Sequence, residues 1–352
     1  MKLPRLTAVF FLLALISILS GCVEQRAGTR QDKNEYEKVR LVMTGNGTEM
    51  GIETLTARHF AELVSEASGG NVHIEYYPND ELMGGNTNEA VRSLTEGAVD
   101  LGGYVSGTMS LIDPRLEIAT IPWSFSSYQE ARQVIDDTGG EYYAKVLAEY
   151  GLVYLGSTHN AMRQLSNNRN PVKTPEDLLG MKIRVLGGEI YRLFFTALGA
   201  EPVPLSWSEL NVALQQGVVA GQENGFFLMR SGHLNDIQRY MTVWNYLYEN
   251  YLFVASRKTF DSLEPKTQEL LREKMREACE WSRDYLENEE VKIRRQFAED
   301  GLEIIDLTPA ELEAFKKQVA PLREQLKAKY GAEACAAFRI DMDKNYKAGD
   351  GK

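Results

Sequence analysis

The chain has 352 residues, of which 43% are hydrophobic and 25% are charged, and this composition is typical of ordinary globular proteins. Its formal net charge of −11 makes it a poor candidate for binding nucleic acid or an anionic lipid surface. If the ligand is an anion, its affinity must come from local positive groups, because the overall field of the protein opposes it.

The first residues have the pattern of a targeting segment rather than of a folded element. A positively charged N-terminal region precedes an apolar stretch over residues 9–19, which is shorter than a typical transmembrane helix. The stretch ends in Leu19-Ser20-Gly21-Cys22, which resembles a bacterial lipobox, and a plain secretory signal is the alternative. We predict a signal peptide over residues 1–21, a lipid on Cys22 and a polar tether over residues 22–36. What remains is long enough for two domains.

Strand and helix patterns alternate through the first half of the folded part. We expect strands over residues 38–44, 71–77 and 99–104, and helices over residues 53–67, 88–96, 128–135 and 141–150. This order predicts an α/β sheet, whose ligand site lies beyond the carboxyl ends of the strands. Ser106 falls at such an end, just after the third strand.

A glycine-rich turn, Gly45-x-Gly47-x-x-x-Gly51, joins the first strand to the first helix. The spacing is one residue too long for a dinucleotide-binding fingerprint, and no clear acidic partner follows the second strand. We interpret the turn as a ligand-facing loop in which Asn46 or Glu49 reaches a polar ligand, with a plain turn as the alternative.

Two arginines lie in strand-like patterns in the middle of the chain. Arg163 enters a short strand pattern that follows another over residues 152–156, and Arg184 lies inside the β-branched run over residues 181–185. A buried arginine stays charged and must find an anion or several hydrogen-bond acceptors. The alternatives are an ion pair with a nearby Glu or Asp and an arginine that faces solvent. A helix pattern over residues 189–198 follows, and its first N–H groups could help to hold an anion.

The rest of the chain adds helices and short strands. Ser206 and Glu209 match a capping box for a helix that ends near residue 217. Further patterns predict strands over residues 241–243, 251–255 and 302–305, a long amphipathic helix over residues 265–299 and a helix after Pro309.

Three motifs carry a resemblance to a known family. They are P-x-D-L-x-G-x-K-I-R-V over residues 175–185, S-W-S-E-L-x-x-A-L-Q-Q-G over residues 206–217 and G-Q-E-N over residues 221–224. Through them the chain resembles the solute-binding component of tripartite ATP-independent periplasmic (TRAP) transporters, the DctP-type family, over nearly all of its length after the leader. One departure is Ala220, where the family usually carries Asp.

The resemblance implies an α/β, two-lobed periplasmic-binding-protein-like fold (class II-like), with a ligand cleft between two α/β domains and a long helix that spans both. We assign residues 37–159 and about 250–286 to lobe I, and residues 160–249 and about 287–345 to lobe II. Residues 346–352 form a tail.

The same resemblance implies a site for a carboxylate-bearing metabolite. Arg184 would form a bidentate salt bridge with the ligand carboxylate, while Arg163 and Asn224 would orient the ligand. Trp207 would supply a flat apolar wall. A sugar acid such as a uronate is preferred over a C4-dicarboxylate, because hydroxyls and a ring face would suit Asn46, Glu49, Ser106, Asn160 and Trp207.

We therefore expect an extracytoplasmic, lipid-anchored, monomeric solute-binding protein that delivers an organic acid to TRAP membrane subunits, with no cofactor, no metal and no nucleic acid. The main alternative is a ligand-sensing partner of a membrane receptor or histidine kinase. An exported enzyme is least favoured, because the sequence has no G-x-S-x-G, H-E-x-x-H or P-loop motif and its four histidines are scattered. Cys279 and Cys335 could form a disulfide or remain ordinary thiols, and neither has partners at zinc-ligand spacing.

Overall fold

The computed structural model describes residues 36–340, apart from the side chains of residues 323, 324, 327 and 328. The predicted signal peptide, the lipidation of Cys22, nearly all of the tether and the tail over residues 346–352 lie outside the described residues. Within the described part, no helix combines the length and the apolar character that crossing a membrane requires.

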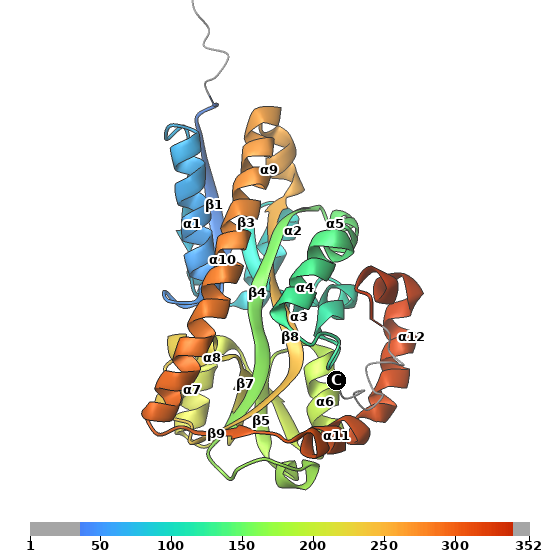
Figure 1. The fold of residues 1–352 in the computed structure, drawn as a ribbon. Helices are drawn as coiled ribbons and strands as arrows, with labels where there is room; N and C mark the ends of the chain where they lie inside the picture. Colours follow the sequence, from blue (N-terminus) through green and yellow to red (C-terminus); the bar gives the residue numbers. More distant parts are fainter. Residues whose placement is uncertain (1–35, 341–352) are drawn as a thin grey trace, which may run out of the picture. The chain divides into compact units, whose positions relative to one another are not determined.

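A mixed sheet with the strand order β2-β1-β3-β8-β4-β7-β5-β6 runs through the described residues, and β9 pairs with β8 outside this path (Figure 1). β1 is parallel to β2 and β3 at one end, and β5 is parallel to β6 and β7 at the other. The strands are β1 Val39–Gly45, β2 Val72–Tyr77, β3 Leu101–Val105, β4 Leu152–Asn167, β5 Lys182–Val185, β6 Glu201–Pro204, β7 Gly221–Asn224, β8 Tyr240–Ser256 and β9 Glu303–Asp306.

Helices fill the connections between these strands. The α-helices are α1 Ile52–Ala67, α2 Thr87–Glu96, α3 Ser106–Met109, α4 Tyr128–Val134, α5 Gly140–Ala148, α6 Glu189–Ala197, α7 Trp207–Gln215, α8 Phe226–Ser231, α9 Arg257–Ser262, α10 Pro265–Glu299, α11 Pro309–Gln318 and α12 Ala320–Ala337. Shorter turns of helix are η1 Glu81–Met83, η2 Pro114–Thr120, η3 Ile135–Gly139, η4 Pro175–Leu178 and η5 Leu234–Asp236. The capping box of Ser206 and Glu209 at the start of α7 is confirmed, as are the predicted bounds of the long helix α10.

Two long antiparallel strands, β4 and β8, connect the two ends of the sheet (Figure 1). β8 pairs with β3 through Leu101 and Ala255, whereas β4 pairs with β7 through Gln164 and Asn224. Each long strand therefore serves both sets of parallel strands, and the expected two-lobed α/β architecture is confirmed. The lobe boundaries that we assigned from the sequence remain a prediction.

The sequence patterns had divided these long strands into pieces, and this was wrong. The strand over residues 152–156 and the short strand of Arg163 are both parts of β4, and the patterns over residues 241–243 and 251–255 are both parts of β8. The reason is that polar residues interrupt the apolar pattern of β8, among them Glu249 and Asn250, which are fully buried. Periodicity alone does not identify a strand whose buried side chains are polar.

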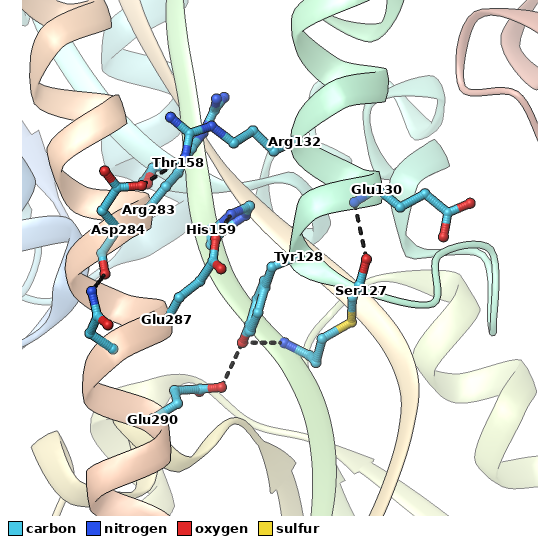
Figure 2. A network of polar contacts seen from close by, with 12 residues as sticks. Ser127, Tyr128, Glu130, Arg132, Thr158, His159, Arg283, Asp284, Glu287 and Glu290 are labelled. Atoms are coloured by element: carbon cyan, nitrogen blue, oxygen red, sulfur yellow. Dashed lines mark hydrogen bonds and ion pairs between the residues drawn. The ribbon is translucent and has the colours of Figure 1, made fainter.

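Side chains of α4 and α10 meet beside β4, as Figure 2 shows. The Tyr128 hydroxyl donates to Glu290 at 2.7 Å and accepts from the backbone N–H of Met162 at 2.8 Å, so it joins three elements. Arg132 of α4 pairs with Asp284 of α10 at 2.7 Å. These contacts fix the backbone of β4 at the residue that precedes Arg163.

Candidate functional site

A pocket lies at the carboxyl ends of β1 and β3 from one end of the sheet and of β5 and β7 from the other. Its lining includes Val105, Arg184 and Asn224 from these strand ends and Tyr251 from β8. The placement agrees with the rule that open α/β sheets bind ligands beyond the carboxyl ends of their strands.

The structure brings together most of the residues that the sequence singled out. Six of the eight predicted contact residues line the pocket: Arg184, Arg163, Asn224, Trp207, Asn46 and Asn160. They come from β5, β4, β7, the start of α7 and the glycine-rich loop after β1, so residues far apart in sequence converge there.

The other two residues lie outside the lining of the pocket. Glu49 is exposed, and its carboxylate pairs with Arg58 instead. Ser106 is fully buried at the start of α3, and its hydroxyl has no hydrogen-bond partner within the described residues. The next residues, Gly107 and Thr108, line a wider groove that opens beside the pocket and shares Arg184 with it.

Arg184 is a buried cation with unused hydrogen-bond donors. Its side chain is fully buried, and its Nε donates to the Leu205 carbonyl at 2.9 Å. Neither Nη1 nor Nη2 has a hydrogen-bond partner among the described residues. Burial lowers the pKa of Arg184 to about 10, so the guanidinium still carries its charge at neutral pH. The guanidinium carbon lies 6.0 Å from the centroid of the Trp207 ring, within the range of a cation–π contact.

Arg163 has a different environment, because two carboxylates of the protein already hold it. Its Nε and Nη2 donate to the Glu223 carboxylate, and its Nη1 donates to Glu249. Its Nη2 also donates to the Glu223 carbonyl at 2.7 Å. Although burial opposes the charge, the two carboxylates raise the pKa of Arg163 well above its usual value. We call Arg163, Glu223 and Glu249 the buried charge cluster.

Amide side chains complete the polar part of the lining. Asn160 is the extra residue of a bulge in β4, between His159 and Ala161 in the pairing with β8, and bulges near sites often redirect a side chain. The Asn160 Nδ2 donates to Glu249 at 2.9 Å, while its Oδ1 is buried and has no partner in the described part of the chain. Asn224 donates to Gln222 at 2.5 Å.

Sequence reasoning missed Glu53, which shapes the glycine-rich loop. Its carboxyl accepts from the Gly47 N–H at 2.7 Å and from the Tyr76 hydroxyl at 2.7 Å. A Cβ on Gly45 would lie 1.6 Å from the Glu53 carboxyl, so a residue without a side chain is needed there. Burial raises the pKa of Glu53 to about 8. An acidic residue directly after a glycine-rich turn is the signal that could have identified it.

Glu249 was missed as well, and it links β8 to β4 and α6 beside the pocket. It is fully buried in β8, where its carboxylate accepts from Arg163, Asn160 and the Tyr191 hydroxyl, the last at 2.5 Å. The available signal was an acidic residue in a run of strand-forming aromatic residues. A buried carboxylate needs a cation or hydrogen-bond donors, just as the buried arginines need acceptors.

Other expectations concern metals and thiols. In the part of the chain that the structure describes, no group of three or more His, Cys, Asp or Glu side chains could hold a metal ion. Cys279 and Cys335 are free thiols in the structure, the first buried and the second partly exposed.

Comparison with known proteins gives consistent matches. The family model for DctP, the bacterial extracellular solute-binding proteins of family 7, matches residues 46–329. The C4-dicarboxylate-binding protein DctB of Bacillus subtilis (strain 168) is 27% identical over 280 residues, which make up 79% of this chain and 79% of that protein. These matches span most of the chain.

Two solved structures share the fold. The sugar acid binding protein DctPAm of Advenella mimigardefordensis, in complex with galactonate, aligns with a TM-score of 0.83 at 24% identity, over 90% of this chain and 100% of that one. A TRAP periplasmic solute-binding protein of Shewanella oneidensis with bound succinate aligns with a TM-score of 0.81 at 22% identity, over 88% of this chain and 99% of that one.

Proposed function

The chain belongs to the bacterial extracellular solute-binding proteins of family 7, and from that premise we propose that its pocket captures a carboxylate-bearing metabolite through Arg184. In this role the protein binds its ligand outside the cytoplasm and delivers it to the membrane subunits of a TRAP transporter. We propose a binding protein rather than an enzyme, since DctB of Bacillus subtilis is a C4-dicarboxylate-binding protein and the solved structures named above are binding proteins as well.

The observation that carries the proposal is the state of the Arg184 guanidinium. Both of its Nη groups are buried without partners among the described residues. The pocket beside them is lined largely by neutral and apolar side chains, and its other cation, Arg163, is already held by Glu223 and Glu249. Leaving a buried charged donor unpaired is costly, so a partner from outside the chain is expected. A carboxylate matches the planar fork of a guanidinium and would satisfy both donors at once.

A sugar acid such as a uronate suits the remaining lining better than a C4-dicarboxylate. Asn46, Asn160 and Asn224 offer neutral amide groups that can bond to hydroxyls, and the Trp207 ring provides a flat surface for a sugar ring. Relatives allow either class, since one solved structure holds galactonate and another holds succinate.

A thermal-shift screen of organic acids tests the proposal. A ligand at 100 times its dissociation constant stabilises the folded protein by about 2.7 kcal/mol, so true ligands should raise the melting temperature clearly. Arg184→Ala should abolish the shift, and Arg184→Lys should restore only part of it, because an ammonium lacks the planar fork. Arg40→Ala, which removes an exposed arginine paired with Glu75, is the matched control. A screen in which no carboxylic acid stabilises the wild type would refute the proposal.

Attachment to the membrane is a second part of the proposal. It rests on the sequence Leu19-Ser20-Gly21-Cys22, with Cys22 as the lipidated residue. Cys22→Ser should release the protein from the membrane fraction while leaving ligand binding unchanged. A wild-type protein with an unmodified N-terminus in the soluble fraction would contradict the lipid anchor, without bearing on the pocket.

A further inference from the structure

The two arginines of the pocket differ in how much charge they can offer a ligand. They are the cationic residues of its lining. A guanidinium has five N–H groups, and four of those of Arg163 already have acceptors in Glu223 and Glu249. Arg163 therefore has at most one N–H left for a ligand. Arg184 keeps both Nη groups for an incoming anion.

Glu249 is ionised in this arrangement, because its carboxylate is in direct contact with the permanently charged Arg163 guanidinium and accepts further hydrogen bonds. Oε2 accepts from Arg163 Nη1 and Asn160 Nδ2, and Oε1 accepts from the Tyr191 hydroxyl. The Gly107 backbone N–H donates to the same carboxylate. Burial raises the pKa of Glu249, but the Arg163 charge and the hydrogen bonds from Tyr191 and Gly107 oppose this rise, and the contact with the guanidinium keeps the carboxylate ionised.

Glu223 has the same kind of environment. Its Oε1 accepts from Arg163 at 2.8 Å, and its Oε2 accepts from Arg163 and from the Tyr246 hydroxyl, the latter at 2.9 Å. The buried charge cluster thus contains one cation and two anions, and its net charge is −1. The positive charge of Arg163 is therefore already neutralised by protein carboxylates and is not available to a ligand.

We propose that Glu249 makes this pocket selective for ligands with a single carboxylate. The inference rests on the proposed function and narrows it to hydroxylated monocarboxylates. One carboxylate pairs with Arg184, whereas a second would meet the neutral amides of the lining and a cluster of net charge −1 next to them. An unpaired charge in such surroundings is strongly unfavourable. The Asn46, Asn160 and Asn224 amides suit hydroxyl groups instead.

Pairs of acids that differ in one end group test the inference on the wild-type protein. Galactonate and galactarate share a six-carbon hydroxylated chain, but galactarate has a carboxylate at both ends. 4-Hydroxybutyrate and succinate form the corresponding four-carbon pair. Calorimetric titration of each acid should give a dissociation constant about 100-fold or more lower for the monocarboxylate of whichever pair binds.

A substitution in the buried charge cluster tests the assigned residue. Glu249→Gln leaves Arg163 with one carboxylate, so the cluster becomes neutral and the preference for the monocarboxylate should fall about tenfold or more. Glu117→Gln is the matched control, because Glu117 is also buried and accepts from a lysine and a tyrosine, Lys329 and Tyr330, at 2.7 and 2.9 Å. The Glu117→Gln variant should prefer the monocarboxylate by the same factor as the wild type. If Glu249→Gln does not fold, Glu223→Gln should show the same fall.

The outcomes separate this inference from the proposed function. Dicarboxylates that bind the wild type as tightly as their monocarboxylate partners would overturn the selectivity while leaving carboxylate capture intact. Unchanged selectivity in a folded Glu249→Gln variant would overturn the role of Glu249. A wild type that binds none of these acids, or any other carboxylic acid in the thermal-shift screen, would overturn the proposed function and the inference together.

Discussion

Glu223 and Arg163 form a two-pronged ion pair in the interior of the protein. Glu223 Oε1 lies 2.8 Å from Arg163 Nη2, Glu223 Oε2 accepts from Arg163 Nε, and the Glu223 carbonyl accepts from the same Nη2 at 2.7 Å. Both side chains are at most 1% exposed. Because Glu223 lies on β7 and Arg163 on β4, the pair holds two adjacent strands together at the wall of the pocket.

Arg163→Ala should therefore destabilise the ligand-free protein. The substitution leaves two buried carboxylates without their cation, which costs on the order of 3–5 kcal/mol of unfolding free energy. Arg184→Ala is the comparison, because Arg184 donates to the Leu205 carbonyl and has no carboxylate partner within residues 36–340. Urea denaturation of the three ligand-free proteins measures the difference. Equal losses in the two variants would contradict the division of roles between the arginines.

Tyr128→Phe should weaken the junction between α4, β4 and α10 (Figure 2). It removes a hydroxyl that donates to the buried Glu290 and accepts from the Met162 N–H. Each buried group left without its partner costs about 1–3 kcal/mol. Denaturation of the ligand-free variant should show this loss. Arg132→Ala, which removes the more exposed contact with Asp284, should have a smaller effect, and the reverse order would argue against the hydroxyl as the main link.

Glu53 should make the stability of the protein depend on pH. Burial raises its pKa to about 8 in the folded protein, above the ordinary value of 4.5. The folded state therefore holds a proton that the unfolded chain has lost at intermediate pH. The stabilising contribution of this proton is complete below pH 4.5 and is lost as the pH rises to about 8, with a slope of up to about 1.4 kcal/mol per pH unit.

Glu53→Gln provides the measurement for this effect, since the amide does not titrate. Urea denaturation at several values between pH 5 and pH 8 should show a shallower decline of unfolding free energy in the variant than in the wild type. Glu290 has a pKa raised to about 7 by burial and contributes its own slope to both proteins. Parallel curves for wild type and variant would show that Glu53 does not retain its proton.

The arginines illustrate what could be predicted from the sequence and what could not. A charged residue in a strand pattern indicated that Arg163 and Arg184 need partners, and both line the pocket. The residues alone left open whether each partner is a ligand or a carboxylate of the protein. For Arg163 the answer depends in part on Glu249. This residue lies 86 residues away in sequence and is brought to Arg163 by the pairing of β4 with β8.

Elements with local signals were predicted well. The long helix α10 begins at Pro265, and the glycine-rich turn is followed by α1 as expected. The continuity of β4 and β8 could not be read from periodicity, because their buried faces carry polar side chains that satisfy one another across strands. Glu49 illustrates a limit of local reasoning, since a loop residue near a pocket can still direct its side chain to a neighbour such as Arg58.

Ligand binding should also draw the two ends of the sheet together. β4 and β8 connect them and can serve as a hinge, and the pocket draws its lining from both ends. Hinge closure is the usual response of proteins with this architecture. Small-angle scattering with a tight ligand should give a smaller radius of gyration than without it, and identical curves at saturation would count against closure.

The most direct test of the central claim, that Arg184 binds a carboxylate, is calorimetric titration of one acid that binds and of its primary amide. The amide keeps the shape of the acid but has no negative charge to pair with the guanidinium. Losing one partner of a buried ion pair costs about 3–5 kcal/mol, and each 1.4 kcal/mol is tenfold in affinity. The account predicts that the wild type binds the acid about 100-fold or more tightly than the amide. Equal affinities for the acid and the amide would contradict it.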